Sequence, residues 1–380
     1  MKSIYLDFAA ATPLDPDVNK AMEHYMASNY YNPSAMYLAG RSVRHDLEQA
    51  RASIAKALGS RPAEVIFTAG ATEANNLAIQ GVGKQYEGSE IIVSAIEHES
   101  VIAPAELYKC KKAPVNKQGI IEVKELEKLI TDKTVLVSAG LVNNEIGTIQ
   151  PLREIAELIK EVRSDRRKNR SNLPLYLHSD AAQAPCYLDV SVARLGVDLM
   201  SINGSKMYGP KQTGALYVKA GITLTPLILG GGQENGLRSG TENVANFIGL
   251  AEAITKAQIL RAKESARVDS LKKMLINKLA KIASASLNSP QNHASPHIVN
   301  ARFWGVDNER LMMELDEDGI QVAVGSACSA SKQEPSHVLR AIGLTKSEAQ
   351  TSLRISLGRQ TTKNDIKALS LQLQKHTPNR

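Results

Sequence analysis

The chain has 380 residues, of which 43% are hydrophobic and 22% are charged. These values predict a soluble globular protein with one large and one smaller domain, and they exclude a disordered or fibrous chain. No apolar run is long enough to span a membrane, and a formal net charge of +7 is too modest at this length to indicate nucleic-acid binding.

The N-terminus and the cysteines indicate the compartment. Asp7 interrupts the stretch where a secretory signal would need apolar residues, and the first residues lack the arginines of an organelle presequence. The three cysteines, Cys110, Cys186 and Cys328, are odd in number and have no metal-ligand spacing. They therefore predict neither a disulfide framework nor a metal site. We expect a cytoplasmic protein.

The first predicted elements lead to a possible phosphate site. Residues 38–58 have apolar side chains at helical spacing, and a short apolar strand follows at residues 65–67. The small residues of 68–73 come next and open a helix. Backbone N–H groups and the Thr72 hydroxyl at such a helix start could hold a phosphate, although a simple helix cap has the same pattern.

Further strands follow along the chain, several of them separated by helical patterns. The apolar runs that predict them are residues 91–93, 135–137, 175–177, 199–202 and 215–218. This alternation predicts an α/β fold with a mainly parallel sheet covered by helices on both faces. Ligands of such sheets bind beyond the carboxyl ends of the strands. The polar residues just past predicted strand ends are Thr72, His98, Asn144, Asp180 and Lys206.

The C-terminal part starts a second group of elements. Residues 242–282 form a long charged helical stretch. Beyond it we predict a strand at 297–300, a helix near 309–315, a strand at 353–356 and a final helix. This order predicts a smaller α+β domain, completed by the first residues of the chain. The expected domain boundaries are 15–255 for the large domain, and 1–14 with 256–380 for the small one.

Lys206 and Asp180 are the most informative pair. A lysine that can form a Schiff base and a carboxylate that can keep a pyridinium nitrogen protonated are what a pyridoxal phosphate site requires. Either residue alone could be a solvated lysine or a helix cap. Their occurrence together, with Asn203, Gly204 and Gly209 around the lysine, favours the cofactor.

Three other residues are candidates. His98 could lie against the cofactor ring, although a lone histidine is more often structural. Thr241 closes the glycine-rich stretch 230–243, which is either a flexible loop or a second source of phosphate ligands. Cys328 lies among small residues in 325–331, and this context favours an accessible, reactive thiol.

Basic residues concentrate at one place outside these motifs, namely Arg163, Arg166, Arg167, Lys168 and Arg170. A solvated helix end and loop is the favoured interpretation. A docking patch for RNA or an acidic protein is the alternative.

Several motifs together resemble the cysteine desulfurases of the IscS/NifS type, in the class V aminotransferase group of fold type I pyridoxal phosphate enzymes. They follow one another along nearly the whole chain, at residues 5–7, 32–33, 72, 142–147, 206, 238–241, 326–328 and 352–359. The resemblance implies a large domain with a mainly parallel sheet of the seven-stranded type between helices. It also implies a smaller α+β domain that carries the Cys328 loop.

The resemblance implies a role for each matching residue around pyridoxal 5'-phosphate. Lys206 would form the Schiff base, Asp180 would pair with the pyridine nitrogen, and His98 would stack on the ring. Asn144 and Gln183 would bond the ring hydroxyl region.

The implied phosphate ligands are Ala71, Thr72, Asn203, Ser205 and, from the neighbouring subunit of a homodimer, Thr241. Asn32 and Arg354 would bind the substrate carboxylate, a task suited to a guanidinium. Cys328 would be the nucleophile, and no metal is implied.

The implied reaction converts L-cysteine to L-alanine and transfers sulfur to Cys328 as a persulfide. The acceptor would be an iron–sulfur scaffold or a tRNA-thiolating enzyme, with no membrane or nucleic acid bound directly. A selenocysteine lyase of the same fold, a non-catalytic sulfur-relay scaffold and a transaminase stay open as alternatives. Ser205 is a departure, because these families usually carry a histidine there. We expect altered cofactor affinity or rate rather than loss of binding.

Overall fold

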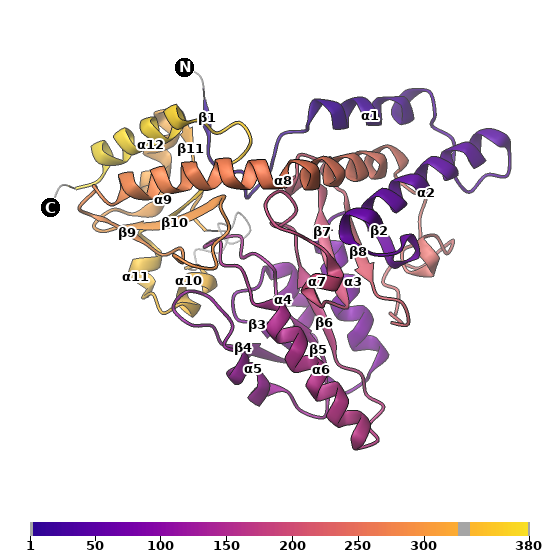
Figure 1. Cartoon of the computed structure of the whole chain (residues 1–380). Coiled ribbons are helices and arrows are strands. Elements are labelled where there is room, and N and C mark those ends of the chain that lie inside the picture. Colours follow the sequence, from indigo (N-terminus) through magenta and orange to yellow (C-terminus); the bar gives the residue numbers. More distant parts are fainter. Residues whose placement is uncertain (1–2, 326–334, 379–380) are drawn as a thin grey trace.

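The computed structural model describes residues 3–325 and 335–378. A central, mainly parallel sheet is covered by helices, and the long helix α8 joins it to a smaller group of antiparallel strands (Figure 1). The structure is therefore α/β, which confirms the fold class predicted from the alternating strands and helices.

Within the described residues, the central sheet contains seven strands in the order β2-β8-β7-β6-β5-β3-β4. Strand β8 is antiparallel to both of its neighbours, whereas the other neighbouring pairs are parallel. The strands are β2 (Val65–Thr68), β3 (Glu90–Ser94), β4 (Lys109–Ala113), β5 (Thr134–Ser138), β6 (Tyr176–Asp180), β7 (Leu199–Asn203) and β8 (Gly214–Val218).

The apolar runs in the sequence correspond to the buried strands of this sheet, but β4 has no such run. Its sequence contains Lys109, Lys111 and Lys112, so it lacks the apolar pattern of a central strand. Strand β4 lies at the edge of the sheet and pairs only with β3 among the described strands. Lysines are typical of edge strands because they discourage pairing with another chain.

Helices surround the central sheet and connect its strands. Helix α2 has the predicted bounds and ends at Gly59, whose φ of 66° is left-handed. The helices of this part are α1 (Pro16–Ala27), α2 (Leu38–Leu58), α3 (Ala71–Gln85), α4 (Glu99–Ala105), α5 (Val123–Leu129), α6 (Leu152–Lys168), α7 (Val192–Leu195) and α8 (Val244–Leu279), with short 3-10 turns η1 (Pro62–Glu64), η2 (Gly204–Lys206) and η3 (Glu234–Gly236).

The C-terminal part contains an antiparallel sheet in the order β12-β10-β9. The N-terminal strand β1 (Ile4–Tyr5) pairs in parallel with β11 (Ile320–Gln321), so the first residues join this part of the molecule. Helix α8 continues without a break through position 255, and the domain boundaries stay a prediction. The remaining elements are β9 (Ala285–Leu287), β10 (Ile298–Phe303), β12 (Ser352–Ser356), α9 (Asn308–Glu317), α10 (His337–Ala341), α11 (Lys346–Ala349) and α12 (Lys363–His376).

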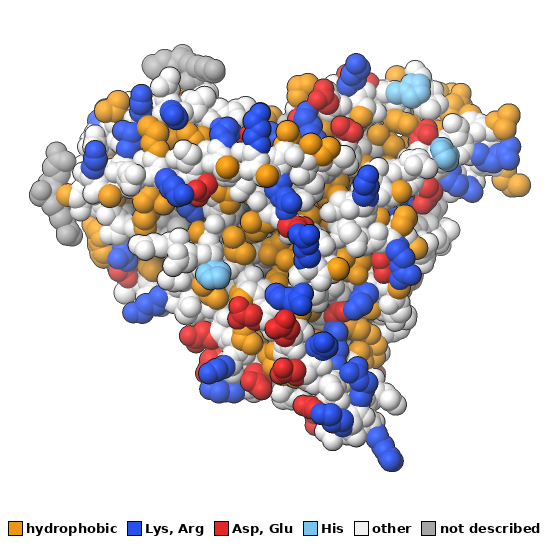
Figure 2. Space-filling view, in the orientation of Figure 1, with side chains coloured by type: hydrophobic (Ala, Val, Ile, Leu, Met, Phe, Trp, Pro, Cys, Tyr) orange, Lys and Arg blue, Asp and Glu red, His pale blue; other side chains and the backbone are white. Residues whose placement is uncertain are grey.

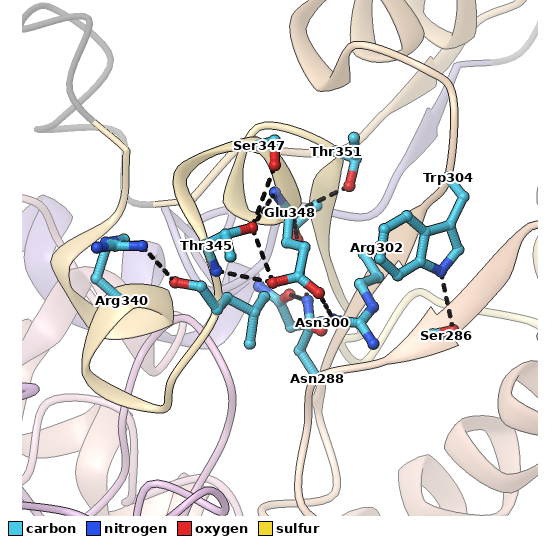
Figure 3. Close-up of polar contacts among 12 residues, drawn as sticks. Ser286, Asn288, Asn300, Arg302, Trp304, Arg340, Thr345, Ser347, Glu348 and Thr351 are labelled. Carbon is cyan, nitrogen blue, oxygen red and sulfur yellow. Dashed lines mark hydrogen bonds and ion pairs between the residues drawn. The ribbon is translucent and has the colours of Figure 1, made fainter.

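A polar cluster fixes α11 against the antiparallel sheet (Figure 3). Arg302 on β10 donates from Nη1 to Oε1 of Glu348 at 2.9 Å, and its guanidinium lies 4.7 Å from the ring centroid of Trp304. Glu348 also accepts from the backbone N–H of Thr345, which caps α11. The cluster joins the capped start of α11 to the last residues of β10.

The predicted basic cluster is partly internal. Arg166 on α6 is buried and donates to four backbone carbonyls, those of Thr131, Thr134, Leu173 and Pro174. Burial lowers the pKa of this guanidinium. Arg163 pairs with Asp198. These two arginines therefore hold α6 to the sheet and are not available as a docking surface.

The face of the molecule in Figure 2 shows basic and acidic side chains interspersed over the surface. A mixed surface of this kind creates no strong field of one sign over that face.

A buried ion pair ties the glycine-rich stretch to the central sheet. Arg51 on α2 donates to both carboxylate oxygens of Glu234, at 2.7 and 2.8 Å, and to the carbonyl of Val65. Glu234 also accepts from the backbone N–H of Phe67, whose ring lies under the guanidinium. The exposed fraction is 9% for the Arg51 side chain and 3% for that of Glu234. Removing either partner would leave a charge buried.

We expect Arg51→Met to destabilise the protein by about 3–5 kcal/mol, because a buried carboxylate without its partner is costly. Urea unfolding of the two proteins measures this difference. The matched control is Arg153→Met, which breaks an exposed pair with Glu157 and should cost at most about 1 kcal/mol. Equal losses in the two variants would contradict the role given to the buried pair.

Candidate active site

One cavity of about 290 Å³ opens at the carboxyl ends of the central strands. The N-terminal segment and β12 close its other side. The structure brings together many of the predicted site residues in its lining, namely Ala71, Thr72, His98, Asn144, Asp180, Gln183, Asn203, Lys206 and Arg354.

Lys206 ends a tight turn that follows β7. Asn203 caps this 3-10 turn, since its side-chain oxygen accepts from the backbone N–H of Ser205. Gly204 is required by close packing, because a Cβ there would lie 2.3 Å from Oγ1 of Thr213. The Lys206 ammonium group contacts the carbonyl of Ala10. The turn therefore fixes the lysine in the wall of the cavity, against the N-terminal segment.

Asp180, the last residue of β6, is held by two donors. Its Oδ1 accepts from the backbone N–H of Ala182 at 2.9 Å, and its Oδ2 accepts from the side-chain amide of Asn75 at 2.7 Å. Asn75 is fully buried on α3. A carboxylate oriented in this way can pair with a cationic ring nitrogen in the cavity.

The same amide orients His98. Nδ2 of Asn75 also donates to the Ser100 hydroxyl, 2.9 Å away. The Ser100 hydroxyl lies 2.8 Å from Nδ1 of His98, which accepts from the backbone N–H of Ser100. Because Nδ1 accepts, neutral His98 carries its proton on Nε2. Asn75 thus connects the carboxylate and the imidazole of the cavity.

The start of α3 contributes backbone donors. Gly70 precedes the helix with a φ of 139°, a conformation that side chains rarely adopt. Ala71 and Thr72 then form the first turn, whose N–H groups have no partners within a helix. Such a turn, opening into a cavity with an ammonium group and an imidazole, suits an anion such as a phosphate.

Arg354 on β12 faces the cavity while almost fully buried. Its Nη2 donates to Oδ1 of Asp7 at 2.6 Å, and its Nη1 donates to the carbonyl of Asn144 at 3.1 Å. Its Nε is buried without a hydrogen-bond partner. A guanidinium in the lining of the cavity is suited to a carboxylate from a ligand.

Glu97 is a second acid in the cavity wall. It is buried, and Oε1 accepts from the backbone N–H of Gly140 at 2.7 Å. Burial raises its pKa to about 8, and the nearby charge of Asp180 acts in the same direction. Near neutral pH, Glu97 is therefore mostly protonated.

Some predicted residues lie outside the lining of this cavity. Asn32 is exposed on the connection between α1 and α2, and its side chain accepts from the backbone N–H of Ser34. Ser205 donates its hydroxyl to Asn203. Thr241 is exposed near the end of the glycine-rich stretch. Cys328 lies outside the described residues.

The other two cysteines have no place in the cavity wall. Cys186 is buried, and this raises the pKa of its thiol to about 12. Cys110 is half-buried on β4, and burial also raises its pKa. Raised pKa values disfavour the reactive thiolate, as expected for packing residues.

Sequence reasoning missed Asn75, Ser100 and Glu97. Asn75 follows Ala71 by four residues and precedes Ala78 by three, so it shares their buried face of α3. A polar residue on that otherwise apolar face is the signal that could have identified it. Glu97 directly precedes His98, and Ser100 follows it by two residues. Nothing in the sequence distinguishes these two residues from helix-cap residues.

Comparison with known proteins agrees with this geometry. A family profile described as Aminotransferase class-V matches residues 4–369. The protein named Cysteine desulfurase IscS from Dictyoglomus turgidum is 40% identical over 373 residues, which cover 96% of this chain and 92% of that protein.

Solved structures are similar over the same length. One described as a NifS-like protein is 31% identical with a TM-score of 0.90, and the match covers 98% of both chains. Another, described as SspA in complex with cysteine, is 34% identical with a TM-score of 0.80, and covers 93% of this chain and 99% of that one.

The chain belongs to the class-V aminotransferase family, whose members are pyridoxal phosphate enzymes. Within that family it is of the IscS/NifS cysteine desulfurase type, so the resemblance seen in the sequence is confirmed. Among residues 3–325 and 335–378, no helix is long and apolar enough to cross a membrane.

The raised pKa of Glu97 predicts a pH dependence of stability. Its pKa is about 8 in the folded chain and about 4.3 when unfolded, so between these values the folded state holds a proton that the unfolded state has released. Raising the pH therefore lowers the free energy of unfolding. For Glu97 alone we expect a fall of about 1 kcal/mol between pH ~7 and ~8 in cofactor-free protein, measured by urea unfolding as the difference between wild type and Glu97→Gln.

The control is Glu97→Gln, which keeps an acceptor for Gly140 but cannot titrate. Burial lowers the pKa of Lys272 to about 8. Because Lys272 loses its proton at a lower pH in the folded chain than in the unfolded chain, its contribution to the free energy of unfolding rises with pH, opposite to that of Glu97. The difference between variant and wild type therefore isolates Glu97. Parallel pH profiles for the two proteins would refute a neutral Glu97.

Proposed function

We propose that this protein is a pyridoxal-phosphate-dependent cysteine desulfurase, which converts L-cysteine to L-alanine and passes the sulfur to Cys328. The observation that carries the proposal is the convergence, in one cavity, of Lys206, Asp180, His98 and the start of α3, with Arg354 on the opposite side. These groups match the parts of a pyridoxal phosphate and of an amino-acid substrate.

The residues of the cavity fit the cofactor by their chemistry. Lys206 would hold it covalently, Asp180 would pair with the ring nitrogen, and Ala71 and Thr72 would bind the phosphate. When bound, the cofactor supplies an electron sink that weakens bonds at the substrate's α-carbon and β-carbon. The donors from Asn75 and Ala182 keep Asp180 in place, and His98 presents an N–H toward the cavity. We expect Asn144, Gln183, Asn203 and Ser205 to complete the binding site.

Arg354 would bind the substrate carboxylate. The position of its guanidinium in the lining of the cavity is the support for this role. The contacts with Asp7 and with the Asn144 carbonyl hold the guanidinium rigid before substrate arrives. Holding the carboxylate at β12 would place the amine and thiol of cysteine over the strand ends. The Lys206 amine, once released, would move the α-proton.

The sulfur transfer balances without an external oxidant or reductant. The Cβ–S bond of L-cysteine breaks, and a new S–S bond forms between that sulfur and the Cys328 sulfur. The Cys328 thiol gives up its proton, and the carbon gains the hydrogen that makes it a methyl group. The sulfur is oxidised to the persulfide level while the β-carbon is reduced. L-Alanine and one persulfide are the products.

We further propose that the protein acts as a homodimer in which Thr241 of the partner subunit completes the phosphate site. Thr241 is exposed and lies outside the cavity of its own chain. Met36 and Leu38, on the α1–α2 connection and the start of α2, are 90% and 77% exposed, and Leu229 beside the glycine-rich stretch is 79% exposed. Figure 2 shows hydrophobic and basic side chains on the tip formed by the α1–α2 connection. Large exposed apolar side chains are typical of interaction surfaces.

The sulfur acceptor would be an iron–sulfur scaffold or a tRNA-thiolating enzyme, in the cytoplasm. The free thiols Cys110 and Cys186 agree with a reducing compartment. Asn32 would assist Arg354 at the substrate carboxylate.

Lys206→Ala should abolish the visible absorbance of the bound cofactor and lower alanine formation about a thousandfold or more, because the lysine both holds the cofactor and moves the proton. Absorbance spectra and an alanine assay measure the two effects. Lys211→Ala, an exposed lysine on the same connection, is the control and should change neither. Retention of the visible band without Lys206 would exclude the proposed attachment.

Cys328→Ser should lower the formation of alanine from L-cysteine about a hundredfold or more while leaving the cofactor spectrum unchanged. The nucleophile is lost, but the cofactor site is not. Cys110→Ser, which removes a thiol outside the cavity, should keep full activity. If Cys328→Ser turned over L-selenocysteine normally but not L-cysteine, the selenocysteine lyase alternative would gain support. Full turnover of L-cysteine would rule out the persulfide step.

A further inference from the structure

A chain of buried side chains extends from the cavity to helix α8. The Gln183 amide donates from Nε2 to the carbonyl of Ala9 at 2.9 Å, and its Oε1 lies 3.2 Å from Nε2 of His297. Nδ1 of His297 lies 2.6 Å from the Ser295 hydroxyl, and Lys272 donates to the Ser295 carbonyl at 2.7 Å. His297, Ser295 and Lys272 are buried behind the cavity wall.

The donors and acceptors of this chain fix one arrangement. The Ala9 carbonyl can only accept, so the nitrogen of the Gln183 amide faces it. The amide oxygen then faces Nε2 of His297, which must carry the proton. Nδ1 is left to accept from the Ser295 hydroxyl. Each bond therefore determines the direction of the next.

The surroundings of His297 keep it neutral. The charged groups that face it are Lys272 on α8 and Arg354 on β12, both cationic, and together with burial they lower its pKa to about 3. Its ring stacks on Tyr187, with centroids 4.3 Å apart and planes 17° from parallel. A neutral, stacked imidazole has one orientation and one N–H donor. The amide oxygen of Gln183 accepts the hydrogen bond from that donor.

We propose that His297 is a positioning residue, which holds the Gln183 amide so that its free N–H points to the ring oxygen of the bound cofactor. The inference rests on the proposed function, since it concerns the same cavity. One N–H of the Gln183 amide donates to the Ala9 carbonyl, and the amide oxygen accepts from His297. The second N–H is therefore the donor that remains for the cavity. Without His297, the amide oxygen is a buried acceptor without a partner, and the side chain moves to find one.

This arrangement has a measurable effect on the cofactor. A hydrogen-bond donor to the ionised ring oxygen stabilises its negative charge. That oxygen then attracts the proton on the Lys206 nitrogen less strongly. The pH at which the visible band titrates is then lower than it would be without the donor. His297 influences this titration through Gln183, without touching the cofactor.

The test compares two substitutions in the loaded protein. His297→Phe keeps the stack on Tyr187 but has no N–H, whereas His297→Gln places an amide N–H near the position of Nε2. We expect His297→Phe to raise the titration midpoint of the visible band by about one pH unit and to weaken pyridoxal phosphate binding about tenfold. His297→Gln should restore most of both values.

Tyr187→Phe is the matched control, since it removes the buried hydroxyl that bonds the Leu357 carbonyl but keeps the stack and the donor to Gln183. It should leave the band titration unchanged. If His297→Phe does not fold, Ser295→Ala gives the same direction of shift, because it frees the imidazole to take the other tautomer.

Equal titration midpoints in wild type and His297→Phe, or equal shifts in the Phe and Gln variants, would overturn the proposal. The proposed function would instead fail if the wild-type protein showed no visible band with pyridoxal phosphate. The two failures are therefore distinguishable in one set of spectra.

Discussion

The N-terminal segment, residues 4–12, is the constraint on which the site depends. Strand β1 joins the C-terminal part by pairing with β11, and Asp7 then holds Arg354. A few residues further on, the carbonyls of Ala9 and Ala10 contact the Gln183 amide and the Lys206 ammonium group. One short segment thus connects the group suited to a substrate carboxylate with the groups at the strand ends. Its backbone polar groups all need partners, so the position of each part restricts the others.

The cavity also contains two carboxyl groups that influence each other. Asp180 and Glu97 are close enough to interact, and burial keeps Glu97 protonated near neutral pH. Asp180 is the acid that has N–H donors from both a backbone and an amide. The protein can therefore place two carboxyl groups in one cavity without both being ionised.

The sequence was sufficient for the elements whose pattern comes from burial. The apolar strands and helix α2 lie where they were predicted, because burial of one face or of a whole strand produces a recognisable pattern of apolar residues in the sequence. Strand β4 was missed because an edge strand rich in lysine has no such apolar pattern. Lys206, Asp180 and His98 could be assigned to one edge, since parallel strands bring their carboxyl ends together.

The partners of those residues could not be predicted in the same way. Asn75 connects Asp180 to Ser100 across 105 and 25 residues of sequence, and His297 reaches Gln183 across 114. Such contacts depend on how the parts pack, which local patterns do not record. Arg166 is a similar case, because only the folded chain shows that its charge faces carbonyl groups rather than solvent.

The ion pair of Arg354 with Asp7 has a consequence for selectivity. An isolated guanidinium buried in a pocket would attract any small anion, including the inorganic phosphate and sulfate that abound in solution. Asp7 offsets the charge of Arg354, so this end of the cavity attracts a free anion less than an unpaired guanidinium would. A ligand that contacts Arg354 therefore gains most when its other groups are also bound. The pocket thereby favours a zwitterionic amino acid, held at both ends, over a simple anion held at one.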